Sequence, residues 1–244
     1  SGIGACCARA FAAQGAKVVA ADLNGDGANE VAQEIGGLAV ACDVGKEQDI
    51  NNLVEKTEKE LGPVDIFFSN AAVATGGNPL DTPIEVWQQQ WEINVMAHVY
   101  AVRAVLPGML DREEGYLIHT ASMAGILTSQ GNLTYATTKH AVVGLAEWLS
   151  ISYHDKGVRT SLLAPLGVNT PMLGGTDSKF ARTAAGPVKE PEDVANMVVD
   201  AVQEERFLIL TDEIAQTWME RKTNDLERWL NGMRRLQGKM DSMS

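Results

Sequence analysis

Short apolar runs alternate along the chain with longer stretches in which apolar residues recur every three or four positions. The short runs predict strands at residues 17–22, 38–43, 64–72, 116–121, 158–164 and 207–210. The longer stretches predict helices at residues 5–14, 25–36, 48–61, 83–110, 135–149 and 191–202. Strands and helices that alternate in this way are typical of a doubly wound parallel sheet, so we expect a Rossmann-like α/β fold.

Two of the amphipathic stretches lead to expectations about packing. The helix at residues 83–110 has one largely apolar face, and we expect its two tryptophans to lie in the core. Residues 212–244 are predicted to form a helical extension of the domain at residues 1–211, with an apolar stripe that packs on its own subunit or on a neighbour. The face consists of Trp87, Trp91, Val95, Val99, Val102 and Leu106, and the stripe of Leu226, Trp229, Leu230 and Met233.

Length and charge narrow the class of protein. A chain of 244 residues, 45% of them hydrophobic, is long enough for one large α/β domain. The net charge of −12 argues against nucleic acid or an anionic membrane as a partner, because both require clustered Lys and Arg. The sequence has neither a run of about 18 apolar residues nor the pattern of a signal peptide, so we expect no membrane span and a cytoplasmic protein.

The cysteines and histidines show no ligand pattern. Cys6, Cys7 and Cys42 are odd in number and two of them are adjacent, which predicts buried, reduced thiols. The histidines are not spaced like metal ligands, so we predict no metal site. They are His98, His119, His140 and His154.

Candidate chemistry is concentrated in residues 122–139. Ser122 closes the strand predicted at residues 116–121, and Tyr135 and Lys139 lie four residues apart on a predicted helix, so their side chains share one face. A tyrosine has a pKa of about 10, and a neighbouring ammonium would favour its phenolate near neutral pH. We therefore predict that Lys139 lowers the pKa of Tyr135 and that Ser122 holds the reacting oxygen. The alternative is a half-buried tyrosine beside a solvated lysine.

The first residues favour a phosphate-binding site. Ser1-Gly2-Ile3-Gly4 runs directly into a predicted helix, whose N-terminal N–H groups could approach a pyrophosphate. Asp22 ends the next strand, where a carboxylate could bind an adenosine ribose or cap the following helix. Because no Arg or Lys follows Asp22 closely, a 2′-phosphate would meet uncompensated negative charge, so NAD is favoured over NADP.

Taken together, residues 1 to about 210 resemble the classical short-chain dehydrogenase/reductase family. The resemblance rests on motifs in the family's order, with spacings like the family's, and not on any single one of them. They are Ser1-Gly2-Ile3-Gly4, Asp22, Asp43-Val44, Asn70-Ala71-Ala72, Asn94, Ser122, Tyr135, Lys139 and the series Pro165, Val168 and Thr170.

The resemblance implies roles for residues that the pattern alone leaves open. Asn94 would interrupt its helix and hold a water that connects Lys139 to solvent, although it could also be an exposed helical residue. Asp43-Val44 would contact adenine, or Asp43 would only cap a helix. Asn70-Ala71-Ala72 would line the cofactor cleft, and Val168 and Thr170 would hold the nicotinamide carboxamide. Lys139 would also hold the cofactor ribose, with Tyr135 beside it in the cofactor site. The family also implies a homodimer or homotetramer.

The chain departs from the family pattern at two points. Leu166 stands where the family has a glycine, and the first strand and the start of the glycine-rich loop have no counterpart in the printed sequence. Either the printed chain is part of a longer one, or the protein lacks this strand and dinucleotide binding is in doubt. We favour the first interpretation, because loss of a central strand would expose two neighbouring sheet edges and an apolar sheet face.

The sequence therefore predicts hydride transfer between NAD and a neutral, hydrophobic secondary alcohol or ketone. Asn132 and Met172 are expected at the substrate, together with Ser122 and Tyr135, and residues 173–189 form either a lid over it or an ordinary surface loop. Three alternatives stay open: an NADPH-dependent carbonyl or acyl-chain reductase, a non-catalytic dinucleotide-binding protein, and a sugar-nucleotide epimerase or dehydratase.

Overall fold

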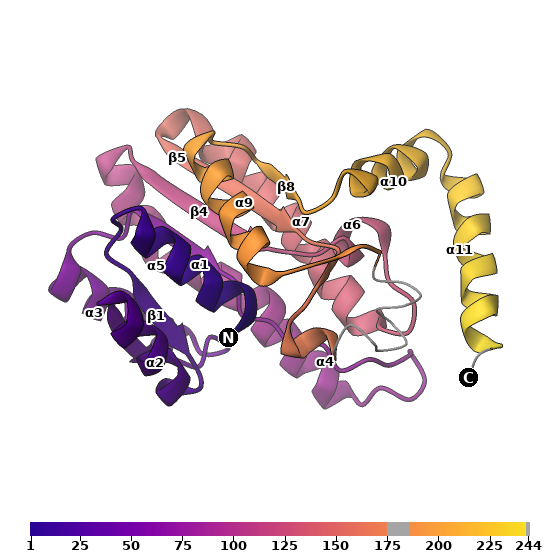
Figure 1. Ribbon diagram of the computed structural model, residues 1–244, viewed down its shortest axis with the longest axis horizontal. Coiled ribbons are helices and arrows are strands. Elements are labelled where there is room, and N and C mark those ends of the chain that lie inside the picture. The colour runs from indigo at the N-terminus through magenta and orange to yellow at the C-terminus, as the bar shows by residue number, and fades with distance from the viewer. Residues whose placement is uncertain (175–185, 243–244) are drawn as a thin grey trace.

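The computed structural model describes residues 1–174 and 186–242 and shows parallel sheets between layers of helices (Figure 1). One sheet has the strand order β3-β4-β5-β8, and all its strands are parallel. Its strands are β3 (Ile66–Ser69), β4 (Gly115–Thr120), β5 (Val158–Ala164) and β8 (Leu208–Leu210). The predicted Rossmann-like α/β fold is confirmed.

A second pair of strands lies apart from this sheet in the hydrogen-bonding pattern. Strand β1 (Val19–Asp22) pairs in parallel with β2 (Leu38–Ala41), and among the described strands each of these pairs only with the other. At the end of the larger sheet, β3 pairs with β4 and with no other strand that the structure describes. Asp22 and Ile66 are exposed at these edges.

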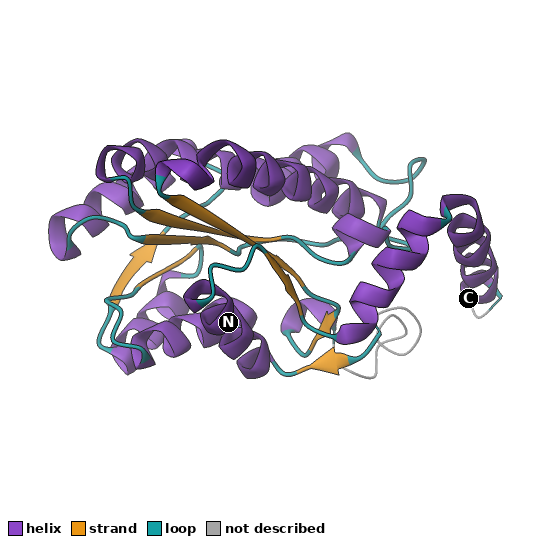
Figure 2. Ribbon diagram, turned by 90° about the horizontal axis from the view of Figure 1, so that it is seen from above, coloured by secondary structure: helices purple, strands orange, loops and turns teal. Residues whose placement is uncertain are grey.

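Helices cover both faces of the sheet (Figure 2). On one face, α1 and α9 pack against β4, β5 and β8 through residues such as Cys7 and Val198. On the other face, α3, α5 and α7 pack against β3, β4 and β5 around Leu117. These helices are α1 (Gly2–Ala13), α3 (Glu47–Leu61), α5 (Ala97–Arg112), α7 (Leu133–Tyr153) and α9 (Pro191–Gln203), and α2 (Gly25–Ile35) packs beside β1 and β2.

Shorter elements complete the described chain. Strands β6 (Gly167–Val168) and β7 (Val188–Lys189) form a small parallel pair next to the larger sheet, and the chain ends in α10 (Glu213–Asn224) and α11 (Leu226–Asp241). Further short elements are α6 (Ala124–Leu127), η2 (His154–Lys156) and η3 (Pro171–Leu173). The predicted lid at residues 173–189 lies largely outside the described residues, and only its two ends are seen.

The helix predicted at residues 83–110 is interrupted. It consists of α4 (Ile84–Trp91), the π-helix η1 (Glu92–Met96) and α5. The prediction that both tryptophans lie in the core is wrong, because Trp91 is 41% exposed and Trp87 is only half-buried. The inward positions at this level belong to Gln90 and Asn94, which are fully buried and form hydrogen bonds to threonines. The spacing of apolar residues cannot identify the buried side of a helix when the buried residues on that side are polar.

The same stretch, Ile84–Arg112, is the one helical segment among the described residues that is long and apolar enough to cross a membrane. Half of its most apolar window is buried in the protein, where α5 packs against α3, β3 and β4. It is a core helix of the α/β domain.

A buried histidine pair joins α5 to β4. The Nδ1 atoms of His98 and His119 are 2.9 Å apart, and both side chains are 1% exposed. Burial, the other histidine and Lys139 hold the pKa of His98 well below 6.5, and burial lowers the pKa of His119 to about 4. The two histidines are 21 positions apart in the chain, and the packing of α5 on β4 brings them together. Their spacing in the sequence therefore gave no sign of the contact.

Acid should therefore destabilise the fold through this pair. Below about pH 6.5 the unfolded histidines bind protons that the folded pair excludes, so the free energy of unfolding falls by about 1.4 kcal/mol per pH unit for each histidine. For His119 this window runs down to pH about 4. Urea unfolding at pH 7 and at pH 5 should show that the free energy of unfolding falls less between these two pH values for His119→Asn than for the wild type. The exposed His154→Asn should match the wild type, and equal losses in all three proteins would contradict this account.

Candidate active site

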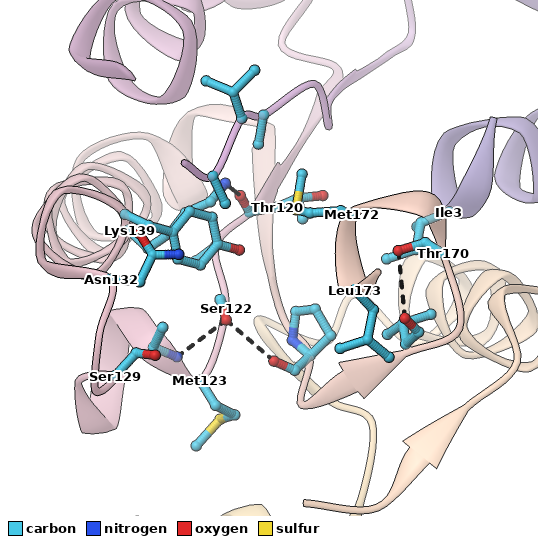
Figure 3. Close-up of a pocket in the computed structure, with 18 of the residues that line it drawn as sticks. Ile3, Thr120, Ser122, Met123, Ser129, Asn132, Lys139, Thr170, Met172 and Leu173 are labelled. Carbon is cyan, nitrogen blue, oxygen red and sulfur yellow. Dashed lines mark hydrogen bonds between the residues drawn. The ribbon is translucent and has the colours of Figure 1, made fainter. Parts of the chain in front are cut away.

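A cleft of about 1100 Å³ opens at the carboxyl ends of the strands. This is where open α/β sheets bind ligands. It is lined by the start of α1, the ends of β1 and β2 and the segment after β3. Residues within 120–124, 127–132 and 165–173 line it too, as do Tyr135 and Lys139. In Figure 3, Ser122 and Lys139 border one side of the cleft, and Ile3 and Thr170 border the other.

Ser122 is fixed between two strand ends. Its Oγ accepts a hydrogen bond from the Ala124 N–H at 3.1 Å and donates one to the Pro165 carbonyl at 3.4 Å (Figure 3). Ala124 begins α6 directly after β4, and Pro165 directly follows β5. The hydroxyl is therefore held at the floor of the cleft by backbone groups of two neighbouring strands.

Lys139 is fully buried on α7, one turn beyond Tyr135. Its Nζ donates a hydrogen bond to the Thr120 carbonyl at 2.7 Å and lies 5.6 Å from the centre of the Tyr135 ring. Burial lowers the pKa of Lys139 to about 7. The residue can therefore exist as an ammonium or as an amine close to neutral pH.

The pKa of Tyr135 differs from our expectation. Burial raises it above 10, and the nearby Ser122 hydroxyl offsets part of this rise. The predicted lowering by Lys139 is not seen, because burial outweighs the other effects and the lysine Nζ lies against the Thr120 carbonyl. Tyr135, Lys139 and Ser122 nevertheless line one cleft, as their spacing predicted.

A close helix contact sets the position of Lys139. Helix α6 packs on α7 at Gly125, where a Cβ atom would lie 2.5 Å from the Lys139 carbonyl oxygen. Real Cβ atoms do not approach backbone so closely, so only glycine fits at this contact without moving one helix.

Asn94 connects the segment after β3 to the helix that carries Lys139. It is fully buried in η1, so the alternative of an exposed helical residue is excluded. Its Nδ2 donates to the Val73 carbonyl at 2.9 Å and to Thr138 Oγ1 at 3.1 Å, and its Oδ1 accepts from the Val73 N–H at 2.8 Å. The expected interruption of the helix at Asn94 is confirmed, and a π-turn provides it.

The glycine-rich start of the chain forms one edge of the cleft. Ser1, Gly2 and Ile3 line it, and Gly4 lies just behind them on α1. Gly2 has φ of +53°, a conformation that favours glycine. A Cβ on Gly4 would lie 2.9 Å from Asn70 Nδ2. Gly4 thus allows the backbone to come this close to Asn70, whereas a Cβ on Gly2 would meet the Thr170 side chain at 3.1 Å.

Asp22 and Asp43 reach the cleft from β1 and from the end of β2. Neither is the N-cap of the following helix, because those positions belong to Asn24 for α2 and Lys46 for α3. Instead, Asp22 accepts a hydrogen bond from the Asn24 N–H at 2.9 Å, and Asp43 accepts one from the Gly45 N–H at 3.1 Å. The helix-cap alternative for the two carboxylates is therefore wrong.

The remaining predicted residues lie around the same cleft. Thr120 Oγ1 donates to Asn70 Oδ1 at 3.0 Å, which joins the motif at residues 70–72 to the end of β4. Leu166, which stands where the family has a glycine, donates its N–H to Thr211 Oγ1 at 3.1 Å. The other predicted residues that line the cleft are Val44, Ala71, Ala72, Asn132, Pro165, Val168, Thr170 and Met172.

Sequence reasoning missed part of the cleft wall. Trp218 and Leu236, from the two C-terminal helices, line the cleft. So do Trp229 and Met233, which belong to the predicted apolar stripe of the tail. The stripe was visible in the sequence, but its place over the cleft depends on long-range packing.

The chain has a doubly wound sheet, and Ser122, Tyr135 and Lys139 lie together at the carboxyl ends of its strands. This arrangement is that of enzymes with a dinucleotide-binding fold. The family model for short chain dehydrogenases matches residues 1–180, and the chain belongs to this family.

Relatives and solved structures agree with this assignment. The chain is 35% identical to 1-deoxy-11-beta-hydroxypentalenate dehydrogenase of Streptomyces exfoliatus, over 93% of this chain and 86% of the relative. It is 30% identical to epidermal retinol dehydrogenase 2 of Mus musculus, over 86% and 70%. A short chain dehydrogenase/reductase from Burkholderia phymatum in complex with NAD superposes with a TM-score of 0.84 at 28% identity, over 93% and 90%. A 3-ketoacyl-(acyl-carrier-protein) reductase from Brucella melitensis complexed with NADH gives 0.81 at 28% identity, over 87% and 93%.

Proposed function

We propose that this protein transfers a hydride between NAD and a neutral, apolar secondary alcohol or ketone. The observation that carries the proposal is the placement of Ser122, Tyr135 and Lys139 in one cleft that also contains the glycine-rich start of α1 and Asp22. Two structural neighbours were solved with NAD and NADH. Two relatives are named 1-deoxy-11-beta-hydroxypentalenate dehydrogenase and epidermal retinol dehydrogenase 2, which supports an alcohol as the substrate.

The residues present fit a nicotinamide dinucleotide. Gly2 and Gly4 keep backbone clear at the N-terminus of α1, where N–H groups favour a pyrophosphate. Asp22, at the end of β1, would accept hydrogen bonds from the adenosine ribose, and Asp43 and Val44 would contact adenine. Pro165, Val168 and Thr170 would hold the nicotinamide end. When bound, the nicotinamide supplies or accepts the hydride.

The side chains at the strand ends would handle the proton and the substrate oxygen. In the oxidation direction Tyr135 accepts the proton of the substrate hydroxyl, and in the reduction direction it returns that proton to the carbonyl oxygen. Ser122 hydrogen-bonds this oxygen and orients it toward the phenol. Lys139 Nζ lies 5.6 Å from the centre of the Tyr135 ring, and its charged form would offset part of the rise in the Tyr135 pKa that burial causes. Asn94 fixes Thr138, the neighbour of Lys139, and would support proton exchange with solvent.

The lining of the cleft favours a neutral substrate. Beside Ser122 it is formed by Met123, Leu127, Leu166 and Leu173, with Asn132 as a polar contact. Among the described lining residues the charged ones are Asp22, Asp43 and Lys139, which we assign to the cofactor and to proton transfer. A carboxylated or phosphorylated alcohol would find no described Arg here to bind its charge.

Steady-state oxidation of neutral secondary alcohols with NAD and with NADP tests the proposal. We expect kcat/KM to be at least roughly tenfold higher with NAD, because a hydrogen bond to a charged group contributes about 1.5–3 kcal/mol and the carboxylate repels a 2′-phosphate. Asp22→Ala should narrow this ratio. Asp26→Ala, which removes an exposed carboxylate in the first turn of α2 outside the cleft, should leave it unchanged. A preference for NADP, or a ratio that Asp22→Ala leaves unaltered, would contradict the assignment of Asp22.

An acyl-chain reductase is the second candidate function. The structural similarity to a 3-ketoacyl-(acyl-carrier-protein) reductase favours it. Reduction of a 3-ketoacyl thioester faster than any neutral ketone would select this function over the first.

We also infer a homodimer or homotetramer. Trp148 and Ile151 lie on α7 and are 58% and 84% exposed. Two large apolar side chains on one helix suit contact with a second copy of the chain.

A further inference from the structure

The cleft extends beyond Ser122 and Tyr135 to a wall that comes from the C-terminal extension. Trp218 of α10 and Trp229, Met233 and Leu236 of α11 line it together with the active-site residues. Figure 1 shows how this is possible, because α10 runs from β8 past α6 and α11 turns across the end of the molecule.

Helix α10 is anchored next to the active site. Its Ala215 is fully buried against Met123 and Leu127, which follow Ser122 in the chain. Lys222 donates a hydrogen bond to the Ile126 carbonyl of α6. Asp212 caps the helix by accepting the Ile214 N–H at 3.0 Å. The start of the wall therefore has a fixed position relative to Ser122.

Helix α11 is attached more loosely and presents an apolar face. It has no buried residue along its 16 positions, and Figures 1 and 2 show it beside the main body of the domain. Trp229, Met233 and Leu236 follow one another at four- and three-residue intervals, so they share the face that lines the cleft. Arg234, Arg235 and Lys239 are exposed around the rest of the helix. Trp229 packs against the apolar cluster around Ala215, and Gln130 Nε2 donates a hydrogen bond to Met233 Sδ at 3.8 Å. The part of this half-buried face that lines the cleft is available to a ligand.

We propose that the apolar face of α11 is the specificity-determining wall of the substrate site and that the substrate is an alcohol with an extended or polycyclic hydrocarbon skeleton. Its carbinol carbon lies at Ser122 and Tyr135, and its far end packs on Trp229 and Met233. The proposal rests on the proposed function. A small-molecule occupant is favoured over a second copy of the chain because the wall is continuous with the cleft that contains Ser122, Tyr135 and Lys139.

Matched substrates of different size test this wall. The full chain is assayed with NAD on cyclohexanol and on a tetracyclic 3-hydroxysteroid. Met233→Ala and Trp229→Ala should raise KM for the steroid by roughly ten- to hundredfold, since even one methylene in an apolar pocket is worth about tenfold or more. KM for cyclohexanol should change less than about twofold. Leu226→Ala, on the same helix but 51% exposed and outside the cleft lining, should change neither KM.

A binding measurement separates this proposal from the proposed function. Titration of the tetracyclic 3-ketone into the cofactor-free protein, followed by tryptophan fluorescence, should give a dissociation constant that Met233→Ala raises and Leu226→Ala does not. If Trp229→Ala disturbs the packing of α11, Met233→Ala still tests the wall. If the protein binds the steroid but oxidises no alcohol, the proposed function is refuted and the proposed wall is not. Equal losses on both alcohols, or a change in sedimentation with no change in either KM, would overturn the wall and indicate a subunit contact.

Discussion

Tyr135→Phe should lower kcat for oxidation of neutral secondary alcohols by about a thousandfold, in the middle of the roughly hundred- to ten-thousandfold range that general acid–base catalysis contributes. The phenol lines the cleft together with Ser122, whereas Lys139 Nζ donates its hydrogen bond to the Thr120 carbonyl. We therefore expect the phenol to exchange the proton with the substrate oxygen. The phenyl ring keeps the packing of α7. NAD affinity, measured by calorimetry, should stay within about threefold of the wild type, since the loss is confined to the proton-transfer step.

Tyr153→Phe is the matched control. Tyr153 ends the same helix, α7, far from the cleft lining, and it also has a lysine near its ring. This variant should retain wild-type kcat. Retention of more than a tenth of the activity in Tyr135→Phe would show that another group carries the proton.

Lys139→Met should reduce kcat by roughly a hundredfold or more, because the Tyr135 phenolate loses its neighbouring cation. Methionine fills a similar volume without placing a charge in a fully buried position, so the fold should persist. The pH at which the oxidation rate reaches half its maximum should move upward, because phenolate formation then requires a higher pH. The pH–rate profiles of the wild type and the variant measure both effects.

Lys156→Met gives the comparison for this prediction. Lys156 Nζ lies 5.1 Å from the centre of the Tyr153 ring, similar to the 5.6 Å between Lys139 and Tyr135, but it is exposed and outside the cleft. Its replacement should leave the profile unchanged. A Lys139→Met variant with a lower rate at every pH and no shift of the profile would mean that Lys139 only positions its neighbours.

Much of the fold followed from the spacing of apolar residues, because parallel strands buried on both faces are short continuous apolar runs. The strands β4 and β5 were recognisable for this reason. The inward side of residues 83–110 was not, because Gln90 and Asn94 occupy the buried positions and Trp91 faces outward. The His98–His119 contact was also unpredictable, since it depends on how far α5 slides along β4.

The candidate site divides in the same way. Ser122, Tyr135 and Lys139 are close in the chain, so one strand end and one helix face could place them. Asp22 and Asp43 could be assigned to the same edge because parallel strands end together. What the sequence could not provide is the electrostatic balance, in which burial raises the pKa of Tyr135, or the position of α11 over the cleft. Both depend on the packing of segments that are distant in the chain.

Isotope transfer tests the central claim most directly. The protein is incubated with NAD and cyclohexanol deuterated at the carbinol carbon, and the nicotinamide is examined by mass spectrometry and NMR. Direct hydride transfer predicts NADH with one deuterium at C4 of the nicotinamide ring, formed by the wild type and by Tyr153→Phe and nearly abolished in Tyr135→Phe. Unlabelled NADH, or no NADH from a protein that binds NAD and cyclohexanone, would contradict the account.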